Sequence, residues 1–218
     1  MLSVVIPTLN AAASLQGCLE ALWEVDEVIV ADGGSGDGTA AIAEAAGARV
    51  VLAPRGRGKQ LSAGAAAARG DWLLFLHADT RLSTGWKAEA EVHVRGAPGK
   101  AACFRFRLDD AASQARAIER GVALRVRLLA LPYGDQGLLI SRRLYEEVGG
   151  YGPLPLMEDV DLVRRIGRLR LDVLAADAIT SPARWRRDGW ARRSGRNLLC
   201  LTLYRSGLSA ERVARLYG

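Results

Sequence analysis

The sequence predicts an α/β protein whose core is an open, mostly parallel β-sheet flanked by helices. Two observations carry this prediction. Short apolar runs rich in branched residues alternate with helical segments through the first half of the chain. The run at residues 72–76 is apolar throughout, which is typical of a central parallel strand covered on both faces. Strands that alternate with helices also predict right-handed crossovers between parallel strands.

The first half is expected to follow a regular order of strands and helices. Residues 2–7 form a β-prone run, and leucines recur at helical spacing over residues 12–23. Glycines at Gly47 and Gly70 mark the ends of two further helices. The remaining elements expected here are strands at 27–32, 49–52 and 72–76 and helices at 39–47 and 60–70.

The second half is less regular, and we expect it to belong with the first half to one domain of residues 1–218. A tail from residue 190 carries one or two amphipathic helices, so the chain divides into segments 1–100, 101–189 and 190–218. The other elements expected are strands at 103–108, 137–141 and 171–175 and helices at 117–131, 142–148 and 157–169.

The composition excludes several classes of protein. Half of the 218 residues are hydrophobic and 25% are charged, which is unlike a disordered chain. No apolar run approaches the roughly 20 residues that cross a bilayer, and no basic leader precedes the first strand, so we expect a cytoplasmic location. The cysteines Cys18, Cys103 and Cys200 are far apart and odd in number, which favours neither a disulfide framework nor a zinc site.

The net charge of +6 favours an anionic partner. A nucleotide diphosphate, a phospholipid surface and a nucleic acid all satisfy this condition, and the charge alone does not choose among them.

Three of the expected strands end in polar segments. Residues 7–10 read Pro-Thr-Leu-Asn, residues 32–35 read Asp-Gly-Gly-Ser, and residues 77–80 read His-Ala-Asp-Thr. Ligands of open α/β sheets bind beyond the carboxyl ends of the strands. We therefore expect the three segments to face one crevice.

Asp32 is the first candidate for ligand binding. At a strand end beside two glycines, its carboxylate could accept a hydrogen bond from a ribose hydroxyl or a uracil N–H, or it could only close a turn. Both interpretations stay open. The nearby residues 36–41 loosely match a dinucleotide fingerprint, but no strand directly precedes them and no acidic residue ends the next strand.

A basic loop at residues 55–60, Arg-Gly-Arg-Gly-Lys-Gln, precedes a helix and could hold a diphosphate through backbone N–H groups and side-chain charge. It lacks the spacing of a P-loop, and a solvated loop is the alternative.

His77 and Asp79 place a nitrogen ligand and a carboxylate two residues apart at a strand end. Mg²⁺ or Mn²⁺ bound there would neutralise a diphosphate leaving group. The alternative is an Asp that caps a turn beside a hydrogen-bonded His.

Further carboxylates begin the helix expected at residue 157. Glu158, Asp159 and Asp161 lie together, so mutual repulsion could raise the pKa of one of them into the range of a general base, while plain helix capping is the alternative. Asp135 and Gln136 lie in a turn and could bind an acceptor or a metal, or simply form that turn.

The segment 184–196 mixes arginines with tryptophans. It could close over a diphosphate or rest on an anionic membrane, and a solvated basic helix face is the alternative for most of its arginines. We expect Arg184 and Trp185 to lie in a loop.

In their order and spacing, the segments at residues 4–10, 28–35, 75–80 and 157–161 resemble those of the family 2 inverting glycosyltransferases, which have a GT-A-type, Rossmann-like fold. The His-Ala-Asp-Thr form at 77–80 and Gly-Asp-Gln-Gly at 134–137 are similar to the selenodomain-associated, or arsenosugar-biosynthesis, subgroup. The resemblance covers nearly the whole chain. It implies a nucleotide-sugar-binding half at 1–100, an acceptor and catalytic half at 101–189, and a helical tail.

The resemblance also implies roles for single residues. Asp79, with His77, would hold a Mn²⁺ or Mg²⁺ ion, and Asp159 of the Glu158–Asp159 pair would be the catalytic base. His77 stands where many relatives have the first Asp of a metal-binding motif, which leaves one carboxylate at the metal. Pro7, Thr8 and Asn10 would border the nucleotide, Asp32 would contact the base or the ribose, and Lys59 would lie near the uridine or the phosphate. The other candidates come from the residues themselves: Asp135 and Gln136 for the acceptor, and Gly33, Ser35, Ala78, Arg184 and Trp185 for the nucleotide sugar.

The function that the resemblance implies is transfer of a sugar from a nucleotide-diphosphate donor, UDP above all, to an acceptor hydroxyl, with no nucleic acid as partner. A nucleotidyltransferase would share the sheet but needs a glycine-rich loop after the first strand, where this chain has Thr8-Leu9-Asn10-Ala11. A non-catalytic nucleotide-sugar sensor or a membrane-surface adaptor is the remaining alternative.

Overall fold

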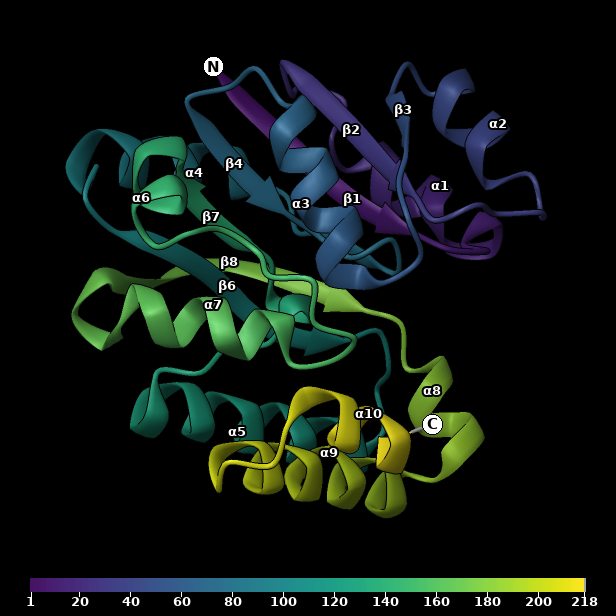
Figure 1. Ribbon diagram of the computed structural model, residues 1–218, viewed down its shortest axis with the longest axis vertical. Helices are drawn as coiled ribbons and strands as arrows, with labels where there is room; N and C mark the ends of the chain where they lie inside the picture. Colours follow the sequence, from purple (N-terminus) through teal and green to yellow (C-terminus); the bar gives the residue numbers. More distant parts are fainter. Residues whose placement is uncertain (218) are drawn as a thin grey trace.

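The computed structural model describes residues 1–217, which form an eight-stranded sheet in the order β3-β2-β1-β4-β7-β6-β8-β5 with helices on both faces (Figure 1). The strands are β1 (Leu2–Thr8), β2 (Glu27–Asp32), β3 (Arg49–Leu52), β4 (Trp72–Phe75), β5 (Thr80–Leu82), β6 (Ala101–Leu108), β7 (Leu138–Ser141) and β8 (Leu171–Thr180). The helices are α1 (Ala12–Glu20), α2 (Thr39–Ala45), α3 (Arg57–Ala67), α4 (Trp86–Gly96), α5 (Ser113–Leu129), α6 (Arg142–Glu147), α7 (Glu158–Ile166), α8 (Ala183–Asp188), α9 (Trp190–Arg205) and α10 (Ala210–Tyr217), with short 3₁₀ turns η1 (Gly134–Gln136) and η2 (Arg168–Arg170).

The sheet is mostly parallel, as the sequence predicts. β1 pairs in parallel with both β2 and β4, β2 pairs in parallel with β3, and β6 with β8. β7 runs antiparallel to β4 and β6, and β5 runs antiparallel to β8. In the register of β1 and β2, Thr8 lies opposite Asp32, so the carboxyl ends of these strands meet at one edge of the sheet. The predicted α/β class is confirmed.

Alternation along the strands divides the core between the two faces of the sheet. Val4 and Leu74 pack with α1, α2 and α4 on one face, whereas their neighbours Val5 and Leu73 pack with α3, α6 and α7 on the other. Because β1 and β4 are buried on both faces, their sequences are apolar at nearly every position. The strand ends are thereby held firmly at the edge where the polar segments begin.

A further layer of helices covers the second half of the sheet. α9 and α10 pack against α7 through Cys200, Val213 and Val160, and α5 packs on β6 with Trp185 of α8 in the same cluster. Among the helices formed by residues 1–217, none combines the length and the apolar character that crossing a bilayer requires.

The structure differs from the sequence prediction in several places. β5 and α4 were not predicted, and β8 continues to Thr180 because it pairs with both β6 and β5. α3 begins at Arg57, inside the expected loop, and α7 ends at Ile166 rather than at residue 169. The expectation that Arg184 and Trp185 lie in a loop was wrong. They lie in α8, which forms because the Trp185 side chain packs against Phe106 of β6.

Candidate active site

The three polar strand ends meet at the edge of the sheet, but Asp32 turns into its own loop. Its carboxylate accepts hydrogen bonds from the hydroxyls of Thr8 and Ser35 and from the backbone N–H groups of Gly34 and Ser35. Burial opposes ionisation, yet these hydrogen bonds lower the pKa of Asp32 below its ordinary value. Of the two interpretations left open by the sequence, the structure shows the turn-closing one, and a contact of Asp32 with a nucleotide stays a prediction.

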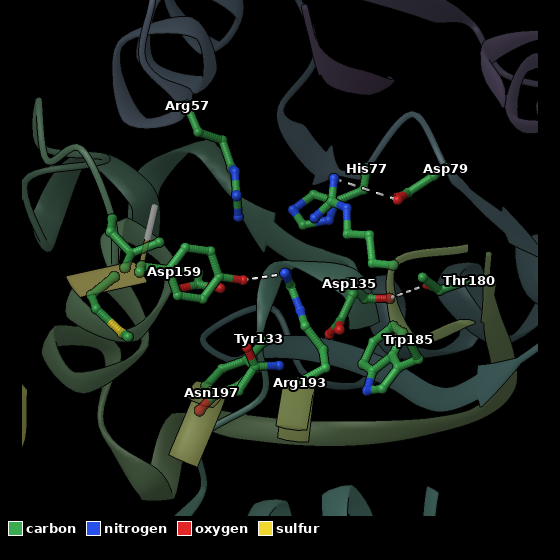
Figure 2. Close-up of a pocket in the computed structure, with 14 residues that line it drawn as sticks. Arg57, His77, Asp79, Tyr133, Asp135, Asp159, Thr180, Trp185, Arg193 and Asn197 are labelled. Carbon is green, nitrogen blue, oxygen red and sulfur yellow. Dashed lines mark hydrogen bonds and ion pairs between the residues drawn. The ribbon is translucent and has the colours of Figure 1, made fainter. Parts of the chain in front are cut away.

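Two adjoining cavities open beside these strand ends. The outer cavity, of about 370 Å³, is lined by five of the residues expected to bind a nucleotide sugar: Pro7, Thr8, Asn10, Ala78 and Arg184. The inner cavity, of about 80 Å³, is lined by residues that include Tyr133, Asp135, Asp159 and Trp185. The wall between the cavities is shared, since both are lined by Arg57, His77, Asp79 and Arg184. Figure 2 shows these groups around the inner cavity, with Arg57 and His77 on one side and Arg193 and Asn197 on the other.

The outer cavity is shaped by a side chain that the sequence analysis did not single out. Gln60 of α3 is buried, and its Nε2 donates to the carbonyl oxygens of Thr8 and Ala31 at the ends of β1 and β2. The amide also packs against Gly33, where a Cβ would lie 3.1 Å from Nε2. Gln60 thus joins α3 to two strand ends, and Gly33 supplies space for it rather than lining the cavity.

Ser35 also acts through its loop. Its hydroxyl accepts a hydrogen bond from the backbone N–H of Asn10, and the Asn10 side chain in turn accepts one from the backbone N–H of Gly36. Asn10 has a φ of 52°, in the left-handed region that asparagine tolerates better than most residues. These bonds fix the backbone that forms one wall of the outer cavity.

Within the basic segment at residues 55–60, the side chain that faces both cavities is that of Arg57, whereas the sequence favoured Lys59. Arg57 and Gln60 are three residues apart and therefore share one face of α3. Lys59 points elsewhere. It is exposed, its side chain lies along Gly56, and it lines neither cavity. Contact between Lys59 and a donor stays a prediction.

His77 and Asp79 stand on the shared wall. Burial, followed by the positive charges of Arg57 and Arg184, lowers the pKa of His77 well below 6.5, so the imidazole is neutral. A neutral imidazole is the form that binds metals. Asp79 Oδ2 lies 3.7 Å from Arg184 Nη2. Within residues 1–217 no three His, Cys, Asp or Glu side chains are clustered so as to hold a metal ion by themselves.

This pair nevertheless fits a Mg²⁺ or Mn²⁺ ion that is shared with a ligand. Such ions are commonly bound by one or two protein groups, with phosphate oxygens and water completing the coordination. A further buried oxygen, Oδ1 of Asp135, faces the same region with no hydrogen-bond partner among the described residues. The donor set therefore agrees with a divalent cation.

The turn η1 brings Asp135 into the inner cavity and keeps Gln136 out of it. Gln136 is buried, and its Nε2 donates to the carbonyl oxygen of Phe104, so it anchors the turn to β6. Burial raises the pKa of Asp135 to about 6, and repulsion from Asp159 and Asp79 adds to this against the attraction of Arg125. An acceptor contact by Gln136 stays a prediction.

Glu158 and Asp159 begin α7 but face different surroundings. Asp159 lines the inner cavity, where its Oδ2 accepts a hydrogen bond of 2.7 Å from the backbone N–H of Gly134. Glu158 is 1% exposed and lies 3.2 Å from Arg57 Nη1, outside both cavity linings. Burial, partly offset by Arg57 and reinforced by Asp159, raises the pKa of Glu158 to about 6. The structure therefore separates the two acids that the sequence placed together.

The arginines near the C-terminus are held by acidic partners. Asp188 forms ion pairs with Arg187, Arg193 and Arg196, and Arg186 pairs with Asp110. Arg193 is 6% exposed and also donates to the hydroxyl of Tyr217, which lines the inner cavity. The sequence indicated the basic segment 184–196 but not its contacts with Asp110 and Tyr217, because these two residues lie outside the segment.

Solved structures with a similar arrangement of elements identify the fold. Glucosyl-3-phosphoglycerate synthase from Mycobacterium tuberculosis, in complex with Mn²⁺, UDP-glucose and phosphoglyceric acid, matches with a TM-score of 0.62 over 95% of this chain and 80% of its own, at 23% identity. TarS from S. aureus, in complex with UDP, matches with a TM-score of 0.65 over 99% of this chain and 69% of its own, at 16% identity. At this level of identity the matches show the fold, which is that of the GT-A glycosyltransferases.

Sequence comparisons then indicate the family. Residues 3–110 match the model for glycosyl transferase family 2. A PGL/p-HBAD biosynthesis glycosyltransferase from Mycobacterium tuberculosis is 38% identical over 93 residues, covering 38% of this chain and 36% of the relative. An uncharacterized glycosyltransferase from Rickettsia felis is 39% identical over 92 residues, covering 41% of this chain and 32% of the relative. The chain thus spans about a third of the length of these relatives, and together the matches support a glycosyltransferase of family 2.

Proposed function

We propose that this protein transfers a sugar from a UDP-sugar to an acceptor hydroxyl with inversion at the anomeric carbon. The observation that carries the proposal is the shared wall of the two cavities. It presents two arginines, a neutral histidine and a carboxylate between the outer cavity, at the nucleotide-binding edge of the sheet, and the inner cavity with Asp135 and Asp159. Several of its solved neighbours contain UDP together with Mn²⁺ or Mg²⁺.

In this proposal the nucleotide lies in the outer cavity against Pro7, Thr8, Asn10 and Ala78, with its diphosphate beside Arg57 and Arg184. Asp32, Gly33 and Ser35 act by shaping the loop. His77 and Asp79 would hold a divalent cation, which supplies Lewis acidity at the diphosphate. The two arginines stabilise the negative charge that develops on the leaving phosphate oxygen.

Asp159 is the general base in this mechanism. It takes the proton of the acceptor hydroxyl as the acceptor oxygen bonds to the anomeric carbon, and the bond from that carbon to the diphosphate oxygen breaks with its electrons going to the phosphate. The hydrogen bond from the Gly134 N–H fixes one Asp159 oxygen and orients the carboxylate. Asp135 lies beside it and contacts the acceptor, while Glu158 acts through its ion pair by orienting Arg57.

We further propose that the chain belongs to the selenodomain-associated, arsenosugar-biosynthesis subgroup, and that residues 1–100 bind the donor while residues 101–189 bind the acceptor. The two segments that suggest the subgroup pack against each other. A Cβ added at Gly134 would lie 2.6 Å from His77 Nε2, so the glycine of one segment makes room for the histidine of the other. The two features that suggest the subgroup are therefore in direct contact.

The test is a screen of UDP-sugars and other nucleotide sugars for Mn²⁺-dependent thermal stabilisation, followed by measurement of nucleotide release with the best donor. Asp159→Asn is expected to lower kcat by about 10²–10⁴-fold without loss of donor stabilisation. Asp161→Asn is the matched control, because Asp161 lies in the same turn of α7 but pairs with Arg165 outside both cavities. Normal turnover by Asp159→Asn would refute its role as base. If no nucleotide sugar stabilises the protein, or if binding occurs without turnover by the wild type, the enzyme proposal fails.

A further inference from the structure

A third cavity lies between the helices that cover the second half of the sheet. It is an apolar groove of about 680 Å³ between α5 and α9, which lie side by side below the sheet in Figure 1. Leu124 and Leu128 of α5 and Leu198 of α9 line it, although their side chains are 56%, 57% and 64% exposed. Leucines exposed to this extent around one concavity indicate a binding surface rather than scattered surface residues.

The groove is continuous with the inner cavity. Tyr133, Asp135, Trp185 and Asn197 line both of them, so the apolar groove opens beside the carboxylates of the proposed active site. Figure 2 shows Trp185, Asn197 and Asp135 among the residues that line the inner cavity. A molecule extended along the groove would therefore bring one of its ends to the place where the acceptor must react.

Buried polar atoms at the junction have no hydrogen-bond partner among residues 1–217. They are Oδ1 of Asp135, Nε1 of Trp185 and Oδ1 of Asn197; Oγ of Ser194, which lines only the groove, also has none. Trp185 is only 7% exposed. A buried polar atom without a partner costs about 1–3 kcal/mol, so groups of them mark a place where a polar ligand binds. Two acceptors beside an indole N–H match a hydroxyl group, which both donates and accepts.

We propose that the groove binds the alkyl chain of the acceptor, which is thus an amphiphile whose hydroxyl enters the junction beside Asp135. This inference deepens the proposed function and rests on it, because the bound amphiphile is an acceptor only if the protein transfers a sugar. A membrane surface would rest on a convex apolar face, whereas this surface is concave and ends in polar atoms at the inner cavity. An alkyl chain with one polar end fits both the concave apolar surface and the polar atoms at its end.

Replacement of Gly121 in α5 by a larger residue can fill this groove without removing any existing contact. It lines the groove, and a Cβ added there would meet no heavy atom within 4 Å. A leucine at this position projects into the groove and also raises helix propensity, since glycine is the poorest helix former after proline. Gly17→Leu in α1 is the matched control, because a Cβ at Gly17 also meets nothing within 4 Å and Gly17 lines none of the three cavities.

The experiment titrates the full chain, without nucleotide, with 1-hexanol, 1-octanol and 1-decanol and follows tryptophan fluorescence, since Trp185 and Trp190 line the groove. The affinity of the wild type is expected to rise about fourfold for each methylene. Gly121→Leu is expected to weaken 1-decanol binding at least tenfold while unfolding at the same or a higher urea concentration than the wild type, and Gly17→Leu is expected to bind like the wild type.

Equal binding by Gly121→Leu and the wild type, or an affinity independent of chain length, would overturn the proposal. A third result would also overturn it. If the wild type and Gly121→Leu both cosediment with phosphatidylserine vesicles and neither binds 1-decanol, the exposed leucines form a membrane contact instead. The binding of 1-decanol is measured without any nucleotide-sugar donor. Binding of 1-decanol without stabilisation by any nucleotide sugar would support the alkyl-chain site and refute the glycosyltransferase proposal, and the reverse result would refute the alkyl-chain site alone.

Discussion

Replacement of Glu158 by glutamine is expected to change stability in a pH-dependent way. Glu158 is 1% exposed, and neither carboxylate oxygen has a hydrogen-bond partner within residues 1–217. The guanidinium of Arg57, 3.2 Å away, supplies the compensating charge. A buried carboxylate that lacks hydrogen bonds is costly to ionise even beside a cation.

The magnitude follows from the pKa of this group. Burial raises the pKa of Glu158 from 4.5 to about 6 despite the attraction of Arg57. One pKa unit corresponds to about 1.4 kcal/mol, so the shift corresponds to about 2 kcal/mol. Between these two pH values the folded protein binds more protons at this site than the unfolded chain. The contribution of Glu158 to the free energy of unfolding therefore falls as the pH rises through this window, and is about 2 kcal/mol lower at pH 8 than at pH 4.

A glutamine cannot ionise, so Glu158→Gln is expected to escape this loss. Relative to the wild type, the variant should therefore gain stability between pH 4 and pH 8. The difference in the free energy of unfolding, variant minus wild type, should be up to about 2 kcal/mol larger at pH 8 than at pH 4, which corresponds to about 4–8 °C in Tm for a chain of this size. Urea unfolding at both pH values measures the difference. Glu146→Gln is the control, because Glu146 is exposed on α6.

Two results would contradict this reasoning. If the difference between Glu158→Gln and the wild type were the same at pH 4 and pH 8, burial would not be the cause of the raised pKa. If the variant were less stable than the wild type at pH 8 by more than about 1 kcal/mol, the ion pair with Arg57 would outweigh the cost of burying the charge.

Three further predictions concern the packing of the site and its metal. Gly58→Ala would place a Cβ 2.2 Å from the carbonyl oxygen of Gly152, so we expect a loss of about 1–3 kcal/mol in urea unfolding, whereas Gly17→Ala, with open space around it, should gain up to about 1 kcal/mol. Gly134→Ala must displace the His77 ring, and we expect at least a tenfold loss in Mn²⁺ affinity in titrations with UDP present; unchanged affinity would remove His77 from the metal site. EDTA should abolish both donor stabilisation and nucleotide release, and Mn²⁺ should restore them; full activity in EDTA would show that the reaction needs no metal.

Local patterns allowed much of the fold to be predicted. The alternation of apolar strands with small-residue helices predicted β1 to β4 and α1 to α3 in their observed order, because each of these elements buries a periodic face of its own. β5 escaped prediction because it is short and is defined by pairing. It lies antiparallel to the end of β8, with Thr80 Oγ1 2.7 Å from Thr180 Oγ1 across a separation of a hundred residues.

The sequence predicted the residue types of the candidate site better than their directions. It predicted that His77 and Asp79 lie at a strand end facing the crevice, and it named Asp135 in a turn and Asp159 at a helix start as further candidates. All four line the inner cavity. It could not distinguish Arg57 from Lys59, because the direction of each cation depends on where α3 begins. A side chain such as Gln60, which bonds to Thr8 across 52 residues, carries no local signal at all.

The order of the elements and the polar strand ends could therefore be predicted from the sequence alone, since both depend on neighbouring residues and on strand or helix period. Which acids share a cavity depends on tertiary packing. Asp32 is satisfied inside its own loop, Glu158 is buried against Arg57, and Asp159 faces the inner cavity, although Glu158 and Asp159 are adjacent in the chain. Successive residues at the start of a helix point about 100° apart, so packing against different neighbours gives two adjacent carboxylates different surroundings.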